Sequence, residues 1–266
     1  MENIKTPGVT ITCLCKTGTP VRHLLDVVIC PQCNRELRLS AESRDRLWTS
    51  YLRQNGPRQP MDIPLVQKSG PGDKDACQAI AAFMALKYFG INVTKEEFYE
   101  RCETAGSGNH ALSWGVLKGV ASYGLYAWLI SGNPYELNEY GDVMEKQGLT
   151  EHEAREKVER LIRECKSNEK IVFYENYEAE VIISRFVEAK AAVLIPTLDW
   201  TDYENHSVVV TNIWDGYVYF NNPNPDTLNR MATEEFLRSW QNEKTDYDII
   251  VISDRNIDFE EINKRE

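Results

Sequence analysis

Apolar residues in the first half of the large C-terminal part of the chain recur at helical spacing. The segment from Ala76 to Phe89 places its large apolar residues on one side at this spacing, and Gly90 follows it as a helix stop. A second helix begins with Thr94 and Glu97, which have the spacing of a capping box. The same periodicity predicts amphipathic helices over the ranges 112–124, 150–166 and 178–190.

After about residue 190 the pattern changes to short β-branched and aromatic runs that are separated by turn residues. Four runs predict strands: AAVLIPTL, HSVVVTNIW, GYVYFNN and YDIIVIS, with a short helix at 233–242 between the last two. A further short strand, MDIPLVQ, is expected just after residue 60. Helices followed by an antiparallel sheet predict the α+β class.

The N-terminal part has a different texture and is separated from the rest by a proline- and glycine-containing break, GPRQP, at 56–60. Residues 40–55 are predicted to be helical, with Ser40 as the N-cap. We therefore predict four parts: a zinc ribbon at 8–40, a helical linker at 41–60, the large α+β domain at 61–253 and a C-terminal tail at 254–266.

The prediction of zinc rests on four cysteines, Cys13, Cys15, Cys30 and Cys33, that form the pairs CLC and CPQC with fourteen residues between them. Thiolates on two tight turns can complete a tetrahedral zinc site, and four protein ligands make such a site structural. The alternatives are four unliganded thiols, or His23 in place of one cysteine. We expect structural zinc and no cofactor for catalysis, and the ribbon is a candidate surface for a protein partner.

Composition limits the class of partner and the compartment. The net charge is −11, from 30 Lys and Arg against 41 Asp and Glu, which argues against nucleic-acid or anionic-membrane binding. No apolar run is long enough to span a bilayer, and the N-terminus lacks the pattern of a secretory signal. We therefore expect a cytoplasmic protein, and seven cysteines, an odd number, argue against a disulfide framework in such a reducing compartment.

A candidate nucleophile lies where the loop SGPGDKDA runs into the first helix. Cys77 is expected in the first helical turn, where the helix dipole and the free amide hydrogens lower the pKa of a thiol. Such a cysteine needs a histidine as its base. Among the four histidines, His206 stands at the start of a strand that leads into a hairpin with Asp-Gly at its turn.

The return strand of that hairpin ends near Asn222, so the Asn222 side chain could reach His206 and orient its imidazole. Upstream, Gln67 ends the predicted strand ten residues before Cys77, and its side-chain amide could donate to a developing oxyanion. Competing interpretations remain: Cys77 as a buried helix cysteine, His206 as an ordinary strand histidine, and Asn222 as a turn residue. Three nearby residues compete with Asn222 for its role: Asn221, Asn224 and Asp226.

Taken together, IPLVQ, DACQAIAAFMALKYFG, NHSVVVTNIWDGYVYFNNP and EEFLRSW resemble the papain-like peptidases of bacteriocin processing and the broader group of double-glycine peptidase-like domains. The resemblance covers residues 61–253 and implies a papain-like fold. It also implies a cysteine peptidase that cuts after a small residue such as Gly, with Cys77 as nucleophile, His206 as base, Asn222 as its orienter and Gln67 as oxyanion donor.

The chain departs from that pattern at three places: Gln78 follows the cysteine in place of glycine, Asn222 replaces the commoner aspartate, and no transporter segments accompany the domain. The region 132–178 is longer than the pattern requires and is a candidate lid or specificity element. Two rival functions stay open beside the peptidase. One is an inactive papain-like domain that binds peptides or proteins as an adaptor, and the other is an acyltransferase or amidase acting on a non-protein amide.

Overall fold

The computed structural model describes most of the chain between Met61 and Ile257, together with short N-terminal pieces. The described ranges are 10–12, 18–20, 27–29, 32–34, 36–38, 61–132, 139–175, 192–200, 203–214, 216–224, 229–241, 245 and 248–257. Three predictions fall outside them: the helix at 178–190, the helical linker, and the arrangement of Cys13, Cys15 and Cys30. In the N-terminal pieces, β1 (Thr10–Thr12) pairs with β2 (Gly18–Pro20) and β3 (Val27–Ile29) with β4 (Glu36–Arg38), both antiparallel.

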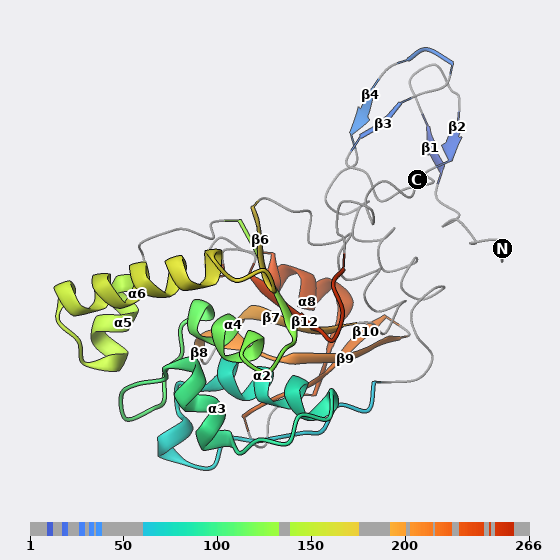
Figure 1. Ribbon diagram of the computed structural model, residues 1–266. Helices are drawn as coiled ribbons and strands as arrows, with labels where there is room; N and C mark the ends of the chain where they lie inside the picture. Colours follow the sequence, from blue (N-terminus) through green and yellow to red (C-terminus); the bar gives the residue numbers. More distant parts are fainter. Residues whose placement is uncertain are drawn as a thin grey trace.

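One mixed sheet organises the large domain, with strand order β11-β10-β9-β7-β12-β5-β6 and with β8 paired to β7 (Figure 1). Its strands are β5 (Tyr126–Ser131), β6 (Ile171–Glu175), β7 (Val193–Trp200), β8 (Tyr203–Ser207), β9 (Val209–Trp214), β10 (Tyr217–Asn221), β11 (Arg230–Ala232) and β12 (Ile249–Ser253). All four predicted runs form strands, although HSVVVTNIW is divided between β8 and β9, and the α+β class is confirmed. The prediction of a purely antiparallel sheet is wrong, because β5 and β6 pair in parallel.

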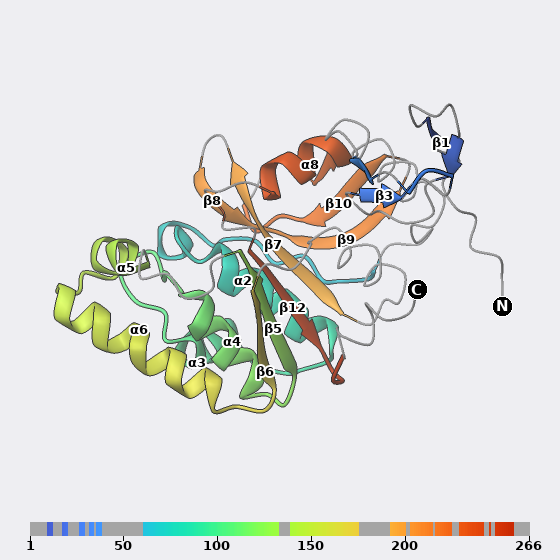
Figure 2. The same cartoon turned by 90° about the horizontal axis from the view of Figure 1, so that it is seen from above.

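Helices cover both faces of this sheet (Figure 2). They are α2 (Cys77–Tyr88), α3 (Lys95–Cys102), α4 (Ser113–Ala121), α5 (Glu139–Gln147), α6 (Glu151–Lys166) and α8 (Thr233–Trp240). Along β12, Ile250 and Ile252 join the core formed with α2, α3 and α4, whereas Ile249 and Val251 join the core formed with α8. Side chains alternate across a strand, so a strand buried on both faces is apolar throughout.

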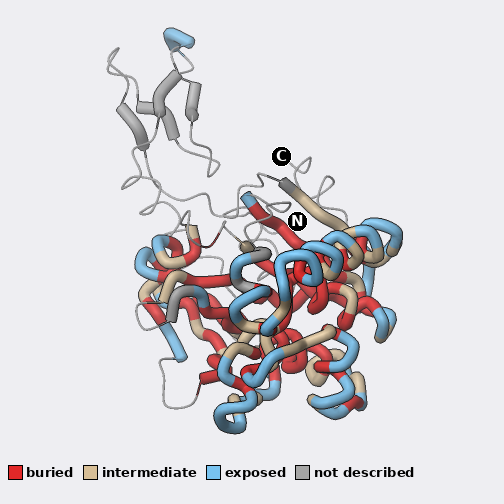
Figure 3. Tube along the Cα trace, turned by 90° about the vertical axis from the view of Figure 1, so that its left-hand side faces the viewer, coloured by how far each residue is buried: buried red, intermediate tan, exposed pale blue. Residues whose placement is uncertain are grey.

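Helix α2 lies at the centre of the first core. All of its residues from Ala79 to Leu86 are buried, so the helix is enclosed on every side rather than on the single side that its large residues predicted. Four of these residues are alanines, whose small side chains let neighbouring elements approach closely. Figure 3 shows this buried interior in red, with exposed segments around it. A helix so enclosed gives its first residue, Cys77, a fixed position.

Helices α3 and α4 pack with their backbones close together because two glycines of α4 face Cys102. A Cβ atom added at Gly115 would lie 2.2 Å from the Cys102 carbonyl oxygen, and one added at Gly119 would lie 2.6 Å from the Cys102 sulfur. Such distances are below van der Waals contact, so only glycine fits there. The predicted capping box of α3 is confirmed, since Thr94 and Glu97 bond each other's backbone N–H.

The long region 132–178 contributes helices α5 and α6 and the edge strand β6. The apolar side of α6 is buried at Ala154, Val158, Leu161 and Cys165, while much of its opposite face is exposed, as the charge pattern predicted. Because β6 pairs in parallel with β5, the two helices form the crossover connection that parallel strands require. The described part of this region therefore extends the sheet.

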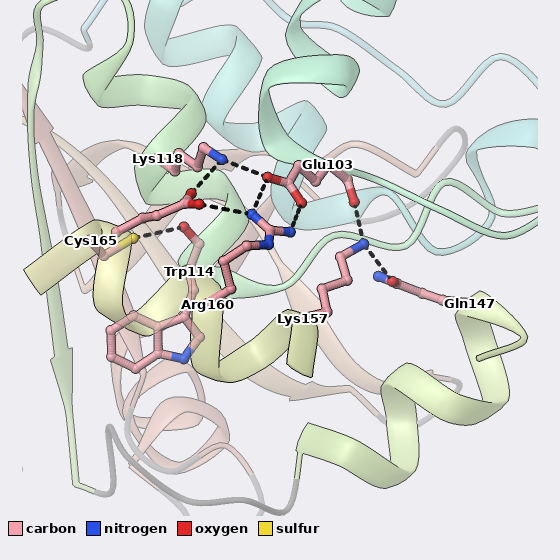
Figure 4. Close-up of polar contacts among 8 residues, drawn as sticks. Glu103, Trp114, Lys118, Gln147, Lys157, Arg160 and Cys165 are labelled. Carbon is pink, nitrogen blue, oxygen red and sulfur yellow. Dashed lines mark hydrogen bonds and ion pairs between the residues drawn. The ribbon is translucent and has the colours of Figure 1, made fainter. Parts of the chain in front are cut away.

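A cluster of ion pairs attaches α6 to the rest of the domain (Figure 4). Lys118 of α4 lies 2.6 Å from Glu103 Oε1 and 2.6 Å from Glu164 Oε2, and Arg160 pairs with both carboxylates. The Arg160 hydrogen bond holds the pKa of Glu103 down at about 2, although partial burial opposes the shift. Lys157 adds bonds to the Glu103 carbonyl and to Gln147 Oε1, both 2.8 Å long.

The segment MDIPLVQ is not a strand, contrary to the prediction from its apolar residues. It runs beside the hairpin and is tied to it by two separate hydrogen bonds rather than a ladder. Met61 N–H donates to the Thr211 carbonyl at 2.8 Å, and the Asn221 side chain donates to the Ile63 carbonyl at 2.7 Å. Pro64, which has no N–H, interrupts any regular pairing.

None of the helices in the described ranges is long and apolar enough to cross a bilayer.

Candidate active site

Cys77 is the first residue of α2, as the sequence predicted, and it is partly exposed. The N-cap residue is Ala76, which has no side-chain oxygen to accept from the amides of the first turn. In any α-helix these first amides lack helical partners. The N-terminus of α2 therefore keeps N–H donors beside the sulfur, and the helix dipole favours negative charge there.

The loop before Cys77 is fixed by Asp73, which lies in the 3-10 turn η1 (Pro71–Asp73) and is buried. Its carboxylate accepts from the Ser69 amide at 2.8 Å, from the Lys95 ammonium at 2.6 Å and from the Tyr99 hydroxyl at 2.9 Å. Burial raises the pKa of this carboxyl, but these hydrogen bonds outweigh it and bring the pKa to about 2. The nucleophile loop is thus anchored to α3 through an ionised group.

A second loop supports the same segment from the other side. Asp75 N–H donates to the Gly108 carbonyl at 2.9 Å, and the Asn109 side chain donates to the Gly72 carbonyl at 2.6 Å. A Cβ atom at Gly108 would lie 2.2 Å from the Asp75 carboxylate, so the close approach requires glycine at this position. These contacts fix the backbone that leads into Cys77.

His206 lies on β8, where it is opposite Leu198 of β7, and it is buried. The imidazole Nε2 lies 2.8 Å from Asn222 Oδ1. An amide oxygen only accepts hydrogen bonds, so Nε2 carries a proton and the other ring nitrogen, Nδ1, is left for the Cys77 sulfur. The neutral ring in this tautomer can accept a proton from the thiol.

Asn222 is itself held in place, because its Oδ1 also accepts from the Asn224 N–H at 2.9 Å. This second bond fixes the amide orientation that puts oxygen, and not nitrogen, toward His206. Asn221 is used elsewhere, on the Ile63 carbonyl, and Asn224 contributes its backbone to Asn222. Of the residues that competed with Asn222 for contact with His206, Asp226 alone lies outside the described ranges.

Trp200 packs against the imidazole of His206 with ring centroids 5.4 Å apart and an interplanar angle of 73°. The same indole lies edge-on to Phe220, at 6.1 Å. An aromatic wall beside the His206–Asn222 bond limits access of water, which strengthens that bond. No local pattern distinguishes Trp200 from the other tryptophans, because β7 and β8 meet only in the folded sheet.

The electrostatics of Cys77 are those of a reactive thiol. Burial raises its pKa, but the hydrogen bond and positive charge of His206 outweigh burial, and the pKa falls to about 6. The charge of Lys68 and the backbone amide of Ser207 act in the same direction. The thiolate is therefore the main form at neutral pH.

Cys102 and Cys165 show the opposite behaviour, as expected for structural cysteines. Burial raises the pKa of Cys102 well above its usual value and that of Cys165 to about 12. The Cys165 thiol donates to the Trp114 carbonyl at 3.2 Å. Among these three helix cysteines, only Cys77 combines partial exposure with a lowered pKa.

Residues 60–247 match the model of the Peptidase_C39 like family. The chain belongs to this family. The match spans well over half of the sequence and contains every residue of the site described above. Membership supports a cysteine peptidase of papain type, the class to which the sequence resemblance also pointed.

Two solved structures are similar to the chain. One is the peptidase domain of Streptococcus ComA, described as a bifunctional ABC transporter involved in quorum sensing, with 14% identity, a TM-score of 0.41, and coverage of 72% of this chain and 98% of that one. The other is assigned as a C39-like peptidase from Bacillus anthracis, with 14% identity, a TM-score of 0.42, and coverage of 75% and 100%. Both TM-scores are below 0.5, so family membership rests on the match to the family model. No curated protein sequence matches the chain.

Gln67, the predicted oxyanion donor, lies in the extended segment that leads into the loop before Cys77, and it is exposed. Its neighbour Lys68 donates its N–H to the Pro223 carbonyl at 2.7 Å, which places Gln67 next to the segment that carries Asn222. In the part of the chain that the structure describes, the Gln67 side-chain amide has no hydrogen-bond partner. The role of Gln67 stays a prediction.

Gln78, which follows the cysteine where the resemblance leads one to expect glycine, bonds to α4. The Ser113 hydroxyl lies 3.1 Å from Gln78 Nε2 and 3.2 Å from Gln78 Oε1.

Two other histidines have contacts elsewhere in the described part of the domain. His152 is exposed beside Glu156 on α6, and the His110 ring lies 3.2 Å from the Gln147 side-chain amide. Three supporting residues carried no sequence signal: Asp73, Lys68 and Trp200.

The predicted zinc ligands fall almost entirely outside the described ranges. Of the four cysteines, Cys33 alone is described, and it is exposed. Within the ranges that the structure describes, no group of three or more His, Cys, Asp and Glu side chains is arranged to hold a metal ion. The zinc ribbon therefore stays a prediction.

Proposed function

We propose that this protein is a papain-like cysteine peptidase in which Cys77 is the nucleophile, His206 the general acid and base, and Asn222 the residue that orients His206. The observation that carries the proposal is the hydrogen-bonded series from Cys77 through His206 to Asn222, with the Cys77 pKa at about 6. A thiolate paired with imidazolium is the form that attacks an acyl carbon.

In the first half of the reaction, the Cys77 thiolate attacks the carbonyl carbon of the scissile peptide bond. The oxyanion that forms accepts from the Cys77 backbone N–H and from the Gln67 side-chain amide, in the manner of an oxyanion hole. His206, protonated at both nitrogens, gives the Nδ1 proton to the leaving amine as the C–N bond breaks. The N-terminal product stays attached to Cys77 as a thioester.

In the second half, His206 is neutral and removes a proton from a water molecule that attacks the thioester carbonyl. The C–S bond then breaks, the carboxylic acid product leaves, and the proton returns the Cys77–His206 pair to its starting state. Throughout, Asn222 keeps the Nε2 proton on the side away from the sulfur, which fixes the useful tautomer.

Cleavage of a peptide library followed by mass spectrometry tests the proposal, with the Cys77→Ala protein as the blank. We expect products from the wild type, with small residues such as Gly before the cut, and none from the variant. Equal cleavage by both proteins would overturn the proposal. Binding of peptides without cleavage by either protein would favour the adaptor, and transfer of an acyl group from Cys77 to an amine would favour the acyltransferase.

A structural zinc ion is proposed for the N-terminal cysteines, because β1 and β2 flank Cys13 and Cys15 in sequence while β3 and β4 flank Cys30 and Cys33. We expect one zinc per chain by mass spectrometry of metals, and loss of that zinc in a Cys30→Ser, Cys33→Ser protein. Peptide cleavage is expected to persist, since the site lies in another part of the chain. A wild-type protein purified with zinc in the buffer that holds much less than one equivalent would contradict the ribbon.

The proposed substrate is a peptide or protein, and the cytoplasm is the proposed location.

A further inference from the structure

Lys68 is bonded to both sides of the site. Its main-chain N–H donates to the carbonyl oxygen of Pro223 at 2.7 Å, directly after Asn222 in the chain. Its ammonium donates to the carbonyl oxygen of Lys74 at 2.7 Å, three residues before Cys77. One residue therefore joins the segment that orients the imidazole to the loop that carries the nucleophile.

This double attachment matters because the two sides come from distant parts of the chain. Cys77 follows a loop, whereas Asn222 directly follows β10. A small displacement between these two segments lengthens the contact of His206 with the Cys77 sulfur. Asp73 anchors the nucleophile loop to α3, away from β10. Lys68 supplies the attachment in the other direction, toward the Asn222 segment.

The ammonium also carries charge close to the nucleophile. The ammonium donates to the carbonyl of Lys74, which places its charge three residues before Cys77 in the chain. The hydrogen bond of the ammonium is exposed, so salt in the solvent can screen its charge. Consistent with this position, the charge of Lys68 contributes to the lowered pKa of the Cys77 thiol, after the larger contributions of His206.

We propose that Lys68 is a positioning residue of this site, which clamps the nucleophile loop to the Asn222 segment and holds a positive charge beside the Cys77 sulfur. The inference rests on the thiolate chemistry of the proposed function. It adds to that function a residue for which neither the family match nor the sequence patterns supplied a role.

Alkylation of Cys77 by iodoacetamide as a function of pH, located by peptide mass spectrometry, tests the charge without any substrate. In Lys68→Met we expect the midpoint of the alkylation profile to rise by roughly half a pH unit, because one charge is lost near the sulfur. Lys68→Arg keeps the charge and is expected to stay close to the wild type. Arg101→Met, which removes an exposed charge on α3, is the control and should not move the midpoint.

Salt provides an independent measure. Raising the salt concentration should raise the wild-type midpoint more than that of Lys68→Met, since only the wild type has this charge to screen. Hydrogen exchange of the peptide covering 69–76 measures the clamp, and we expect exchange several-fold faster in Lys68→Met than in the wild type. A merely structural lysine would change the exchange but leave the salt dependence of the midpoint as in the wild type.

The proposal is overturned if Lys68→Met keeps the wild-type midpoint, or if Lys68→Arg shifts as far as Lys68→Met. Both comparisons are differences between proteins, so they can be read whether or not the wild type cleaves peptides. A wild type that cleaves nothing but shows the Lys68 shift would remove the peptidase proposal and leave this one. A wild type that cleaves peptides without the shift would do the reverse.

Discussion

Replacing His206 by alanine is expected to move the alkylation midpoint of Cys77 from about 6 to at least the value of an ordinary thiol, about 8.5. The reason is that burial alone raises the pKa of the Cys77 thiol, and the bond and charge of His206 are the largest opposing contributions. Peptide cleavage should fall by about 10³-fold or more, since in the proposed mechanism the same residue protonates the leaving amine and activates water.

The two measurements separate the contributions of His206. Alkylation needs the thiolate alone, so its midpoint reports the ion pair, whereas kcat/KM for a cleaved peptide also needs proton transfer. The matched control is His152→Ala, because His152 is exposed on α6 and pairs only with Glu156 among the contacts described for it. We expect wild-type behaviour from that variant in both assays. An alkylation midpoint near 6 in His206→Ala would show that the histidine does not hold the thiolate.

Much of the site could be predicted because its members are marked by local patterns. Cys77 follows a loop of Gly, Pro and Asp and begins an apolar helix, and Gly90 ends that helix with a backbone φ of 75°. His206 lies on β8 just before β9, Asn222 directly follows β10, and β9 and β10 form a hairpin that brings residues on its two arms together. The local patterns and the predicted hairpin therefore brought together Cys77, His206 and Asn222, which hydrogen bonds connect in the structure.

One detail of that prediction was wrong in a way the pattern could not reveal. HSVVVTNIW was predicted as one strand, but the chain forms β8 and β9, which are separated at Val208. The first pairs with β7 through Leu198 and His206, and the second pairs with β10. The break is hidden because it falls within three consecutive buried valines, Val208 to Val210, with no Gly or Pro to mark it.

The strands β5 and β6 were missed for a related reason. Each follows a helix, and β5 is a short apolar run that periodicity alone does not distinguish from the end of that helix. The place of β5 beside β12 and of β6 beside β5 depends on long-range pairing, which local patterns do not encode. The same holds for Asp73, Lys68 and Trp200, whose roles arise from partners that are distant in the sequence or from main-chain groups.

The carboxylate of Asp73 attaches the loop before Cys77 to α3, and Asp73→Asn is expected to lower the free energy of unfolding by about 2 kcal/mol at neutral pH. The estimate follows from the drop of the pKa from 3.8 in the unfolded chain to about 2 in the folded protein. An amide in its place keeps the size of the side chain but loses the charge that Lys95 faces at 2.6 Å.

The pH dependence of this difference gives the sign of the effect. A carboxyl whose pKa is lower in the folded state contributes stability that is fully present above the unfolded pKa of 3.8 and is lost as pH falls toward 2. The difference in unfolding free energy between wild type and Asp73→Asn, measured by urea denaturation, should therefore be constant at and above about pH 5 and shrink below pH 4. Other carboxyls such as Glu103 are present in both proteins and cancel in the difference.

Asp254→Asn serves as the control, since Asp254 is exposed, and we expect its unfolding free energy to match the wild type at every pH. The anchoring of the loop also predicts a functional effect of Asp73→Asn, because loosening of residues 69–76 shifts Cys77 relative to His206. Alkylation of Cys77 should then lose part of its low-pH reactivity in Asp73→Asn while Asp254→Asn keeps it. A difference in stability that persisted undiminished at pH 2 would show that Asp73 acts through its shape rather than its charge.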